Sequence, residues 1–116
     1  MLLPYRENAV VESAKVRGDY LNEAVRYEPN SKVGLFVDVL GFADPWTLRL
    51  VLLHHGRSCP VDSIHPGDYG RTYNVVGPFL GPSGRSVQRM NTSWILTPGS
   101  TTPRSTTAFP RPRRRV

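Results

Sequence analysis

Hydrophobic residues in the first half of the chain recur at the three- and four-residue spacing of helices. Ser13 is suited to cap a short helix with the apolar face Ala14, Val16, Tyr20 and Leu21. A second helix is predicted after Asn30 and Ser31, either of which can cap it, with Val33, Phe36, Val37 and Leu40 on one face and Gly41 as C-cap. Asp44 and Pro45 open a third helix, ended by Gly56, with the core face Leu48, Val51, Leu52 and His55.

The second half of the chain changes to the alternation that is typical of strands. One side of the first strand would carry Tyr69, Arg71, Tyr73 and Val75, and the other side Thr72, Asn74 and Val76. Turns at 81–84 and 98–103 set off a strand within 85–97, with Trp94 in the core, and a short strand over 104–109. This order predicts an α+β fold with about three helices packed on a three- to four-stranded antiparallel sheet.

The length of 116 residues fits one domain, which we expect to span residues 1–110 and to be followed by a flexible basic tail, 111–116. The net charge of +6 lies in the second half, because residues 1–60 carry seven basic and seven acidic side chains and residues 61–116 carry eight and two. Thirteen of the fifteen basic residues are arginine, which forks onto phosphates and stacks on bases. This charge indicates a polyanionic partner, nucleic acid above all, although a soluble protein with a basic tail would have the same total.

Few residues offer chemistry by themselves. His55 is expected on the core face of its helix and His54 in solvent, while His65 is expected on a turn before the first sheet strand. Cys59 is the single cysteine, and no spacing of His, Cys, Asp or Glu matches a metal motif, so we expect no metal and no cofactor. No apolar run reaches the ~18 residues of a membrane helix, and the first residues lack the pattern of a signal peptide.

A set of arginine, tyrosine and threonine residues remains on the predicted sheet: Tyr69, Arg71, Tyr73, Arg85, Arg89, Thr106 and Thr107. Metal-free RNA cleavage needs a base for the 2′-hydroxyl proton, a cation for the charged phosphorane and an acid for the leaving 5′ oxygen. The alternative is a sheet with one packed face and one polar face in water. That alternative explains the alternation but not why the polar face would be so cationic.

Several short motifs follow one another in a specific order. They are Asn8–Val10, Lys15–Leu21, Ser31-Lys32, Phe36, Leu40–Phe42, Tyr69–Tyr73, Gly77, Gly81–Arg85, Trp94-Ile95 and Thr107–Pro110. In this order the chain, from about Pro4 to Pro110, resembles the bacterial family described as domain of unknown function 6883. Domains of this family look like those at the C-terminal ends of polymorphic bacterial toxins. Their layout is similar to the barnase–EndoU–colicin–RelE group of metal-free ribonucleases.

The resemblance implies site residues at Lys32, Arg71, Tyr73, Arg85 and Thr107. Relatives tend to carry a His-Pro-x-Gly-Arg segment ahead of the lysine, where this chain has residues 26–30, Arg-Tyr-Glu-Pro-Asn. If that histidine is a catalytic base in relatives, either His65 or Lys32 replaces it here, or the protein is not a nuclease.

We therefore predict a metal-independent endoribonuclease toxin module that cleaves RNA through attack of the 2′ hydroxyl on the phosphate. Arg71 and Arg85 would hold the scissile phosphate. Lys32 or His65 would move protons, and Tyr73 and Thr107 would position the substrate. RNA, with tRNA among the candidates, would also be held by Tyr69, Arg89, Arg104, Arg111, Arg113, Arg114 and Arg115.

We expect an acidic immunity or antitoxin protein as a partner. We expect no association with a membrane. The expected site of action is the cytoplasm, with delivery as part of a larger secreted toxin. Two other functions stay open, a non-catalytic RNA-binding module and a protein-interaction role such as an adaptor or immunity protein. The charge of +6 argues against an immunity protein, because partners that cover a phosphate site are usually acidic.

Overall fold

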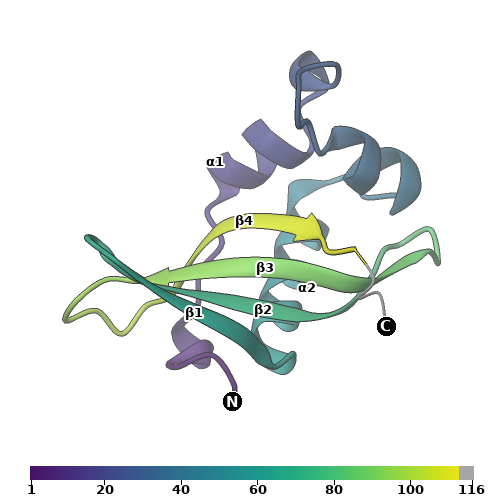
Figure 1. Ribbon diagram of the computed structural model, residues 1–116. Coiled ribbons are helices and arrows are strands. Elements are labelled where there is room, and N and C mark those ends of the chain that lie inside the picture. Colours follow the sequence, from purple (N-terminus) through teal and green to yellow (C-terminus); the bar gives the residue numbers. More distant parts are fainter. Residues whose placement is uncertain (113–116) are drawn as a thin grey trace.

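Four antiparallel strands in the order β1-β2-β3-β4 form a single sheet in the computed structural model, which describes residues 1–112. The strands are β1 (Val61–Gly67), β2 (Gly70–Leu80), β3 (Ser86–Leu96) and β4 (Arg104–Pro110). Helix α2 (Pro45–Ser58) lies behind the sheet, and the helical residues 13–40 stand beyond its β4 edge (Figure 1). The predicted α+β fold is therefore confirmed. Of the predicted basic tail, Arg113, Arg114 and Arg115 lie outside the described residues.

The helical residues beyond β4 contain more irregular turns than the apolar pattern predicts. Helix α1 (Ser13–Lys15) continues directly into the π-helix η2 (Val16–Tyr20), and a second π-helix, η4, spans Gly34–Val39. The 3-10 turn η3 (Glu23–Val25) completes this part, whereas the 3-10 turn η1 (Arg6–Asn8) lies beside the C-terminal end of α2, where Arg57 donates a hydrogen bond to the Arg6 carbonyl. The prediction that Ser13 caps the first helix is wrong, since the cap position with extended backbone is Glu12.

Helix α2 begins as predicted and ends later. The Asp44 carboxylate accepts a hydrogen bond from the Thr47 backbone N–H at 2.8 Å, and Pro45 occupies the first turn. The helix continues past Gly56 to Ser58, so the prediction that Gly56 ends it is wrong. At Gly56 a Cβ atom would overlap the indole ring of Trp94, which is fully buried. The glycine therefore allows helix and sheet to pack closely instead of stopping the helix.

Strand β1 includes a residue that the sequence placed elsewhere. His65 lies within this strand, paired with Thr72 of β2, and not on a turn as predicted. β1 is an edge strand, and edge strands are where a sheet tolerates a proline such as Pro66. The core lies between α2, the helical residues beyond β4, and one sheet face. Its largest members include Trp94, Tyr20, Phe36, Phe42 and Phe79.

A buried polar network joins the strands around Asn91 and Ser93, which are 0% and 4% exposed. Ser93 donates a hydrogen bond to Asn74 at 2.6 Å, and Asn91 donates one to Ser93 at 2.9 Å. Arg111 donates to Asn91 at 3.0 Å and to the carboxylate of Asp62 at 2.9 Å. Arg111 thus holds the chain beyond β4 onto the sheet and to β1.

Candidate functional site

Lys32 connects the start of the second helical segment to the sheet. Its Nζ donates a hydrogen bond to the Thr107 hydroxyl of β4 at 2.5 Å, across 75 residues of sequence. The same nitrogen lies 5.6 Å from the centre of the Tyr20 ring, within the range of a cation–π contact. Two residues that the family resemblance implies as members of one site, Lys32 and Thr107, are thereby in direct contact. Among residues 1–112, Lys32 forms no ion pair with a carboxylate.

The surroundings of Lys32 lower its pKa below the ordinary value of a lysine. Partial burial is the main cause, because it disfavours the ammonium form, and the positive charge of Lys15 acts in the same direction. The carboxylate of Asp19 opposes both effects. Lys15 and Asp19 are themselves ion-paired at 3.1 Å along one face of α1–η2. A lysine in this setting is neutral at lower pH than a free lysine, which is what a proton acceptor requires.

The buried ring of Tyr20 packs against the Lys32 amine. The residue is 0% exposed, and its hydroxyl has no hydrogen-bond partner among the described residues. Burial, followed by the charge of Asp19, raises the pKa of its hydroxyl. Tyr20 therefore stays protonated at any ordinary pH, and its ring offers Lys32 an apolar, electron-rich surface.

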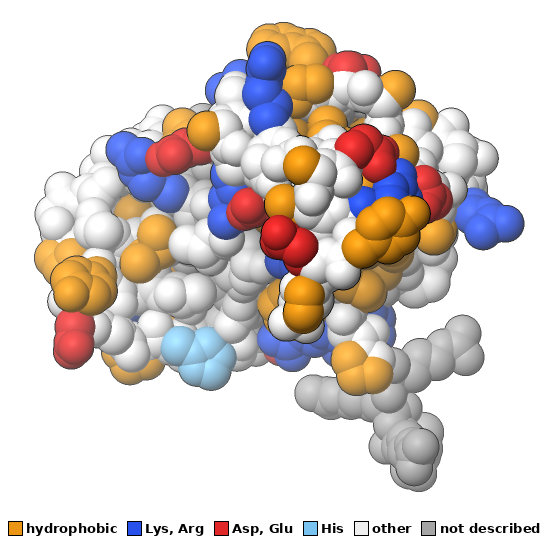
Figure 2. All heavy atoms as spheres, turned by 90° about the horizontal axis from the view of Figure 1, so that it is seen from above, with side chains coloured by type: hydrophobic (Ala, Val, Ile, Leu, Met, Phe, Trp, Pro, Cys, Tyr) orange, Lys and Arg blue, Asp and Glu red, His pale blue; other side chains and the backbone are white. Residues whose placement is uncertain are grey.

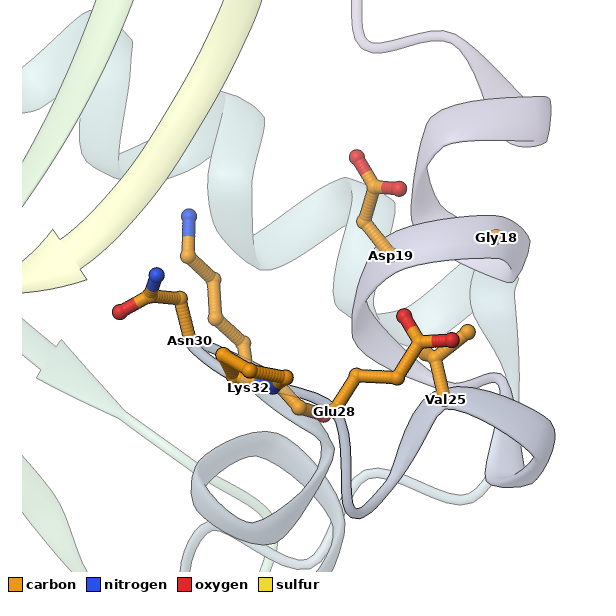
Figure 3. A pocket seen from close by; sticks show the side chains of 8 residues that line it. Gly18, Asp19, Val25, Glu28, Asn30 and Lys32 are labelled. Atoms are coloured by element: carbon orange, nitrogen blue, oxygen red, sulfur yellow. The ribbon is translucent and has the colours of Figure 1, made fainter.

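A pocket of about 250 Å³ opens beside Lys32, between α1–η2 and the connector to η4. In Figure 3 the Lys32 side chain extends from the connector, and Asp19 projects from the neighbouring helix. Asn30 in this connector has the left-handed backbone conformation, with φ 62°. The remaining lining residues are Gly18, Val25, Glu28, Pro29 and Ser31.

Arg71 and Tyr73 lie away from Lys32, at the end of the sheet where the β1–β2 and β3–β4 connections lie. Both line a pocket of about 330 Å³ together with residues 96–100, and Tyr69 in the adjoining turn is 81% exposed. Arg85 follows the opposite end of β2. An 11-residue strand such as β2 extends over about 30 Å. The expectation that Arg71 and Arg85 hold one phosphate therefore does not agree with their positions.

His65 is also separate from Lys32, because β1 and β4 are the two opposite edges of the sheet. Of the two histidines on α2, His55 is buried and His54 exposed, as predicted.

The arginines predicted to contact nucleic acid differ in whether other side chains already bind them. Arg104 is ion-paired with Glu12 at 2.8 Å, and Arg111 is bound to the sheet as described above. Arg89 is partly buried, and its Nε has no partner among the described residues. On the face seen from above, basic and acidic side chains alternate without forming one basic patch (Figure 2). This mixture agrees with the balanced charge of residues 1–60.

Three further residues around Lys32, namely Lys15, Asp19 and Tyr20, were not among the predicted site residues. The spacing of Lys15 and Asp19, i and i+4 on a helix, is the signal that points to their ion pair. It does not show that the pair faces Lys32, because that depends on how the helix is placed beside β4.

Within residues 1–112, no helix has the length and hydrophobicity needed to cross a membrane. The same residues contain no group of three or more His, Cys, Asp or Glu side chains arranged to hold a metal ion.

Comparison with known proteins gives a structural neighbour and a family. A chain of the "Contact-dependent growth inhibition toxin - immunity protein complex from Klebsiella pneumoniae 342" has a similar fold, with a TM-score of 0.66. The two chains are 20% identical over 94% of this chain and 98% of that one, so the likeness shows the fold alone. A search of curated proteins finds no match. The sequence model of the family described as domain of unknown function, DUF6883, matches residues 2–112, and the chain therefore belongs to this family.

Proposed function

We propose that this chain is a bacterial toxin domain that cleaves RNA without a metal ion, with Lys32 as the proton acceptor. The observation that carries the proposal is the setting of Lys32, which is partly buried, has no carboxylate partner among the described residues and is bound to Thr107. Partial burial without an ion pair disfavours the ammonium form, and lysines with lowered pKa serve as general bases.

The reaction follows from these groups. Neutral Lys32 takes the proton of the RNA 2′ hydroxyl, whose oxygen attacks the adjacent phosphorus. The bond from phosphorus to the 5′ oxygen breaks, and that oxygen leaves as a hydroxyl after taking a proton from water. The products are a 2′,3′-cyclic phosphate and a 5′-hydroxyl end.

Two neighbours of Lys32 have supporting roles in this proposal. The ammonium group of Lys15 offsets the negative charge that develops on the phosphorane. Thr107 fixes the direction of the Lys32 amine through its hydroxyl oxygen.

A protein partner belongs to the same proposal. The structural neighbour comes from a toxin–immunity protein complex, and a toxin that cleaves RNA must be neutralised in the cell that makes it. A chain with a net charge of +6 is best covered by an acidic protein, because opposite charges speed association and specify the partner. RNA, including tRNA, is the proposed substrate, and the cytoplasm is the proposed site of action.

Incubation of the purified chain with total bacterial RNA in EDTA tests the proposal. We expect discrete RNA products whose upstream fragments end in a 2′,3′-cyclic phosphate. Intact RNA that still shifts on a native gel would contradict catalysis and favour an RNA-binding module, the second candidate, which the exposed Tyr69 and Arg71 support. Intact RNA without a shift would leave a protein-interaction role.

A further inference from the structure

The pocket at the end of the sheet is separate from Lys32 and has its own chemistry. The β1–β2 turn and the β3–β4 connection meet there, and Gly70, with φ 131°, lets these two segments approach each other closely. A Cβ atom at Gly70 would overlap the Leu96 carbonyl oxygen. The volume of about 330 Å³ suits a small ligand, since such pockets start near ~300 Å³.

Arg71 supplies the charge of this pocket. It is exposed and makes no ion pair among residues 1–112, although Asp68 is in the neighbouring turn. Two of the other four arginines in residues 61–112 are ion-paired, Arg104 with Glu12 and Arg111 with Asp62. An unpaired guanidinium beside polar turn residues such as Thr97 and Ser100 is suited to a phosphate group.

Tyr69 supplies an aromatic surface at the rim. Its side chain is 81% exposed in the turn before β2, directly adjacent in sequence to the pocket residues Gly70 and Arg71. A free tyrosine ring next to a free guanidinium is a combination on which bases of single-stranded nucleic acid stack.

The strand register fixes the distance of this pocket from Lys32. Arg71 pairs with Leu96, and its neighbour Ile95 pairs with Arg104, three residues before Thr107. The two places are therefore about 10 Å apart along the strands and about 10 Å apart across them. A strand of a few nucleotides can span this separation.

We propose that the Arg71–Tyr69 pocket is a second RNA contact, which holds a nucleotide outside the cleaved bond. Its phosphate lies on Arg71 and its base stacks on Tyr69. The inference rests on the proposed RNA substrate and gives Arg71 a binding role in place of the catalytic one expected from sequence.

Binding of a fluorescein-labelled single-stranded RNA with methylated 2′ hydroxyls, which cannot be cleaved by this route, tests the proposal by fluorescence anisotropy. Arg71→Ala and Tyr69→Ala should each weaken binding about tenfold. Tyr69→Phe, which keeps the ring, should bind like the parent. Arg6→Ala is the charge-matched control, because Arg6 is outside both sites, and its Kd should change less than about twofold.

Cleavage kinetics separate this inference from the proposed function. Arg71→Ala should raise KM and leave kcat within about twofold, since uniform binding is lost and transition-state contacts are not. A lower kcat at unchanged KM, or unchanged anisotropy in both alanine variants, would overturn the second contact. Loss of binding in these variants together with an inactive parent would support the pocket while refuting the nuclease.

Discussion

At the scale of residues, the proposed chemistry depends on one amine, that of Lys32. Lys32 is held by Thr107 on one side and the Tyr20 ring on another, and two opposite charges on α1–η2 act on its pKa. The effects of Lys15 and Asp19 have opposite signs, so they give a test that does not depend on the size of the shift.

The pH dependence of cleavage should move in opposite directions in two variants. In the proposed mechanism, activity should rise with pH as Lys32 loses its proton, at a pKa below the ordinary lysine value. Asp19→Asn removes a charge that raises this pKa, so the rise should move to lower pH. Lys15→Ala removes a charge that lowers it, so the rise should move to higher pH. Profiles of kcat/KM against pH check both, and shifts in the same direction would contradict Lys32 as the base.

We expect His55 to make the folding stability depend on pH. Its Nε2 donates to the Gly77 carbonyl at 3.1 Å, so Nδ1 accepts from the Thr92 hydroxyl at 2.8 Å. That hydroxyl accepts in turn from the Trp94 indole N–H at 2.9 Å. The network is complete only with a neutral ring, and burial is the main cause that lowers the pKa of His55.

Because the unfolded chain binds a proton at His55 more readily than the native one, stability should be lost as pH falls from about 6.5 through the lowered native pKa. Urea unfolding at pH 7 and at pH 5.5 measures this. The loss should shrink in His55→Gln, even though that variant is less stable at pH 7, and an equal loss in both proteins would exclude His55 as the cause.

At the scale of elements, the chain shows which features local sequence determines. Asp44 and Pro45 start α2 as predicted, because capping depends on neighbouring residues only. The end of α2 was not predictable, because Gly56 is required by Trp94 of β3, 38 residues further on. β1 was missed because Ile64, His65, Pro66 and Gly67 interrupt the usual pattern, and its pairing with β2 supplies the order that its sequence lacks.

Two glycine substitutions should have opposite effects on stability. Gly56→Ala places a methyl group into the Trp94 ring and should reduce the free energy of unfolding by about 1–3 kcal/mol. Gly34→Ala in η4 meets nothing within 4 Å and should increase it by about 0.5–1 kcal/mol. Denaturant unfolding of both variants measures these changes, and a neutral Gly56→Ala would mean that α2 and β3 are less tightly packed.

At the scale of the whole molecule, distant segments form both the fold and the candidate site. The family resemblance implied Lys32 and Thr107 as members of one site, and the fold brings these two residues into contact. They also grouped Arg71 with Arg85, which stand at opposite ends of β2 because alternation does not show how long a strand is. Lys15, Asp19 and Tyr20 joined the site only through the placement of α1–η2 beside β4.

Arg111 links the end of the described chain to the first strand. Arg111→Ala would leave the buried Asn91 oxygen without its donor and should destabilise the protein by about 1–3 kcal/mol. Arg104→Ala removes an exposed ion pair with Glu12 and should change stability by less than about 1 kcal/mol. Thermal unfolding of both variants tests this, and equal effects would mean that Arg111 contributes no more than a surface charge.

The most direct test of the central claim is the single-turnover rate of RNA cleavage in EDTA by the parent, Lys32→Ala and Lys32→Arg. Arginine keeps the positive charge but cannot accept a proton near neutral pH. Both variants should lose about 100-fold or more in cleavage rate, as expected for removal of a general base, while their unfolding midpoints show a folded protein. Cleavage at the parent rate by folded Lys32→Ala, or full activity of Lys32→Arg, would contradict the assignment of Lys32 as the proton acceptor.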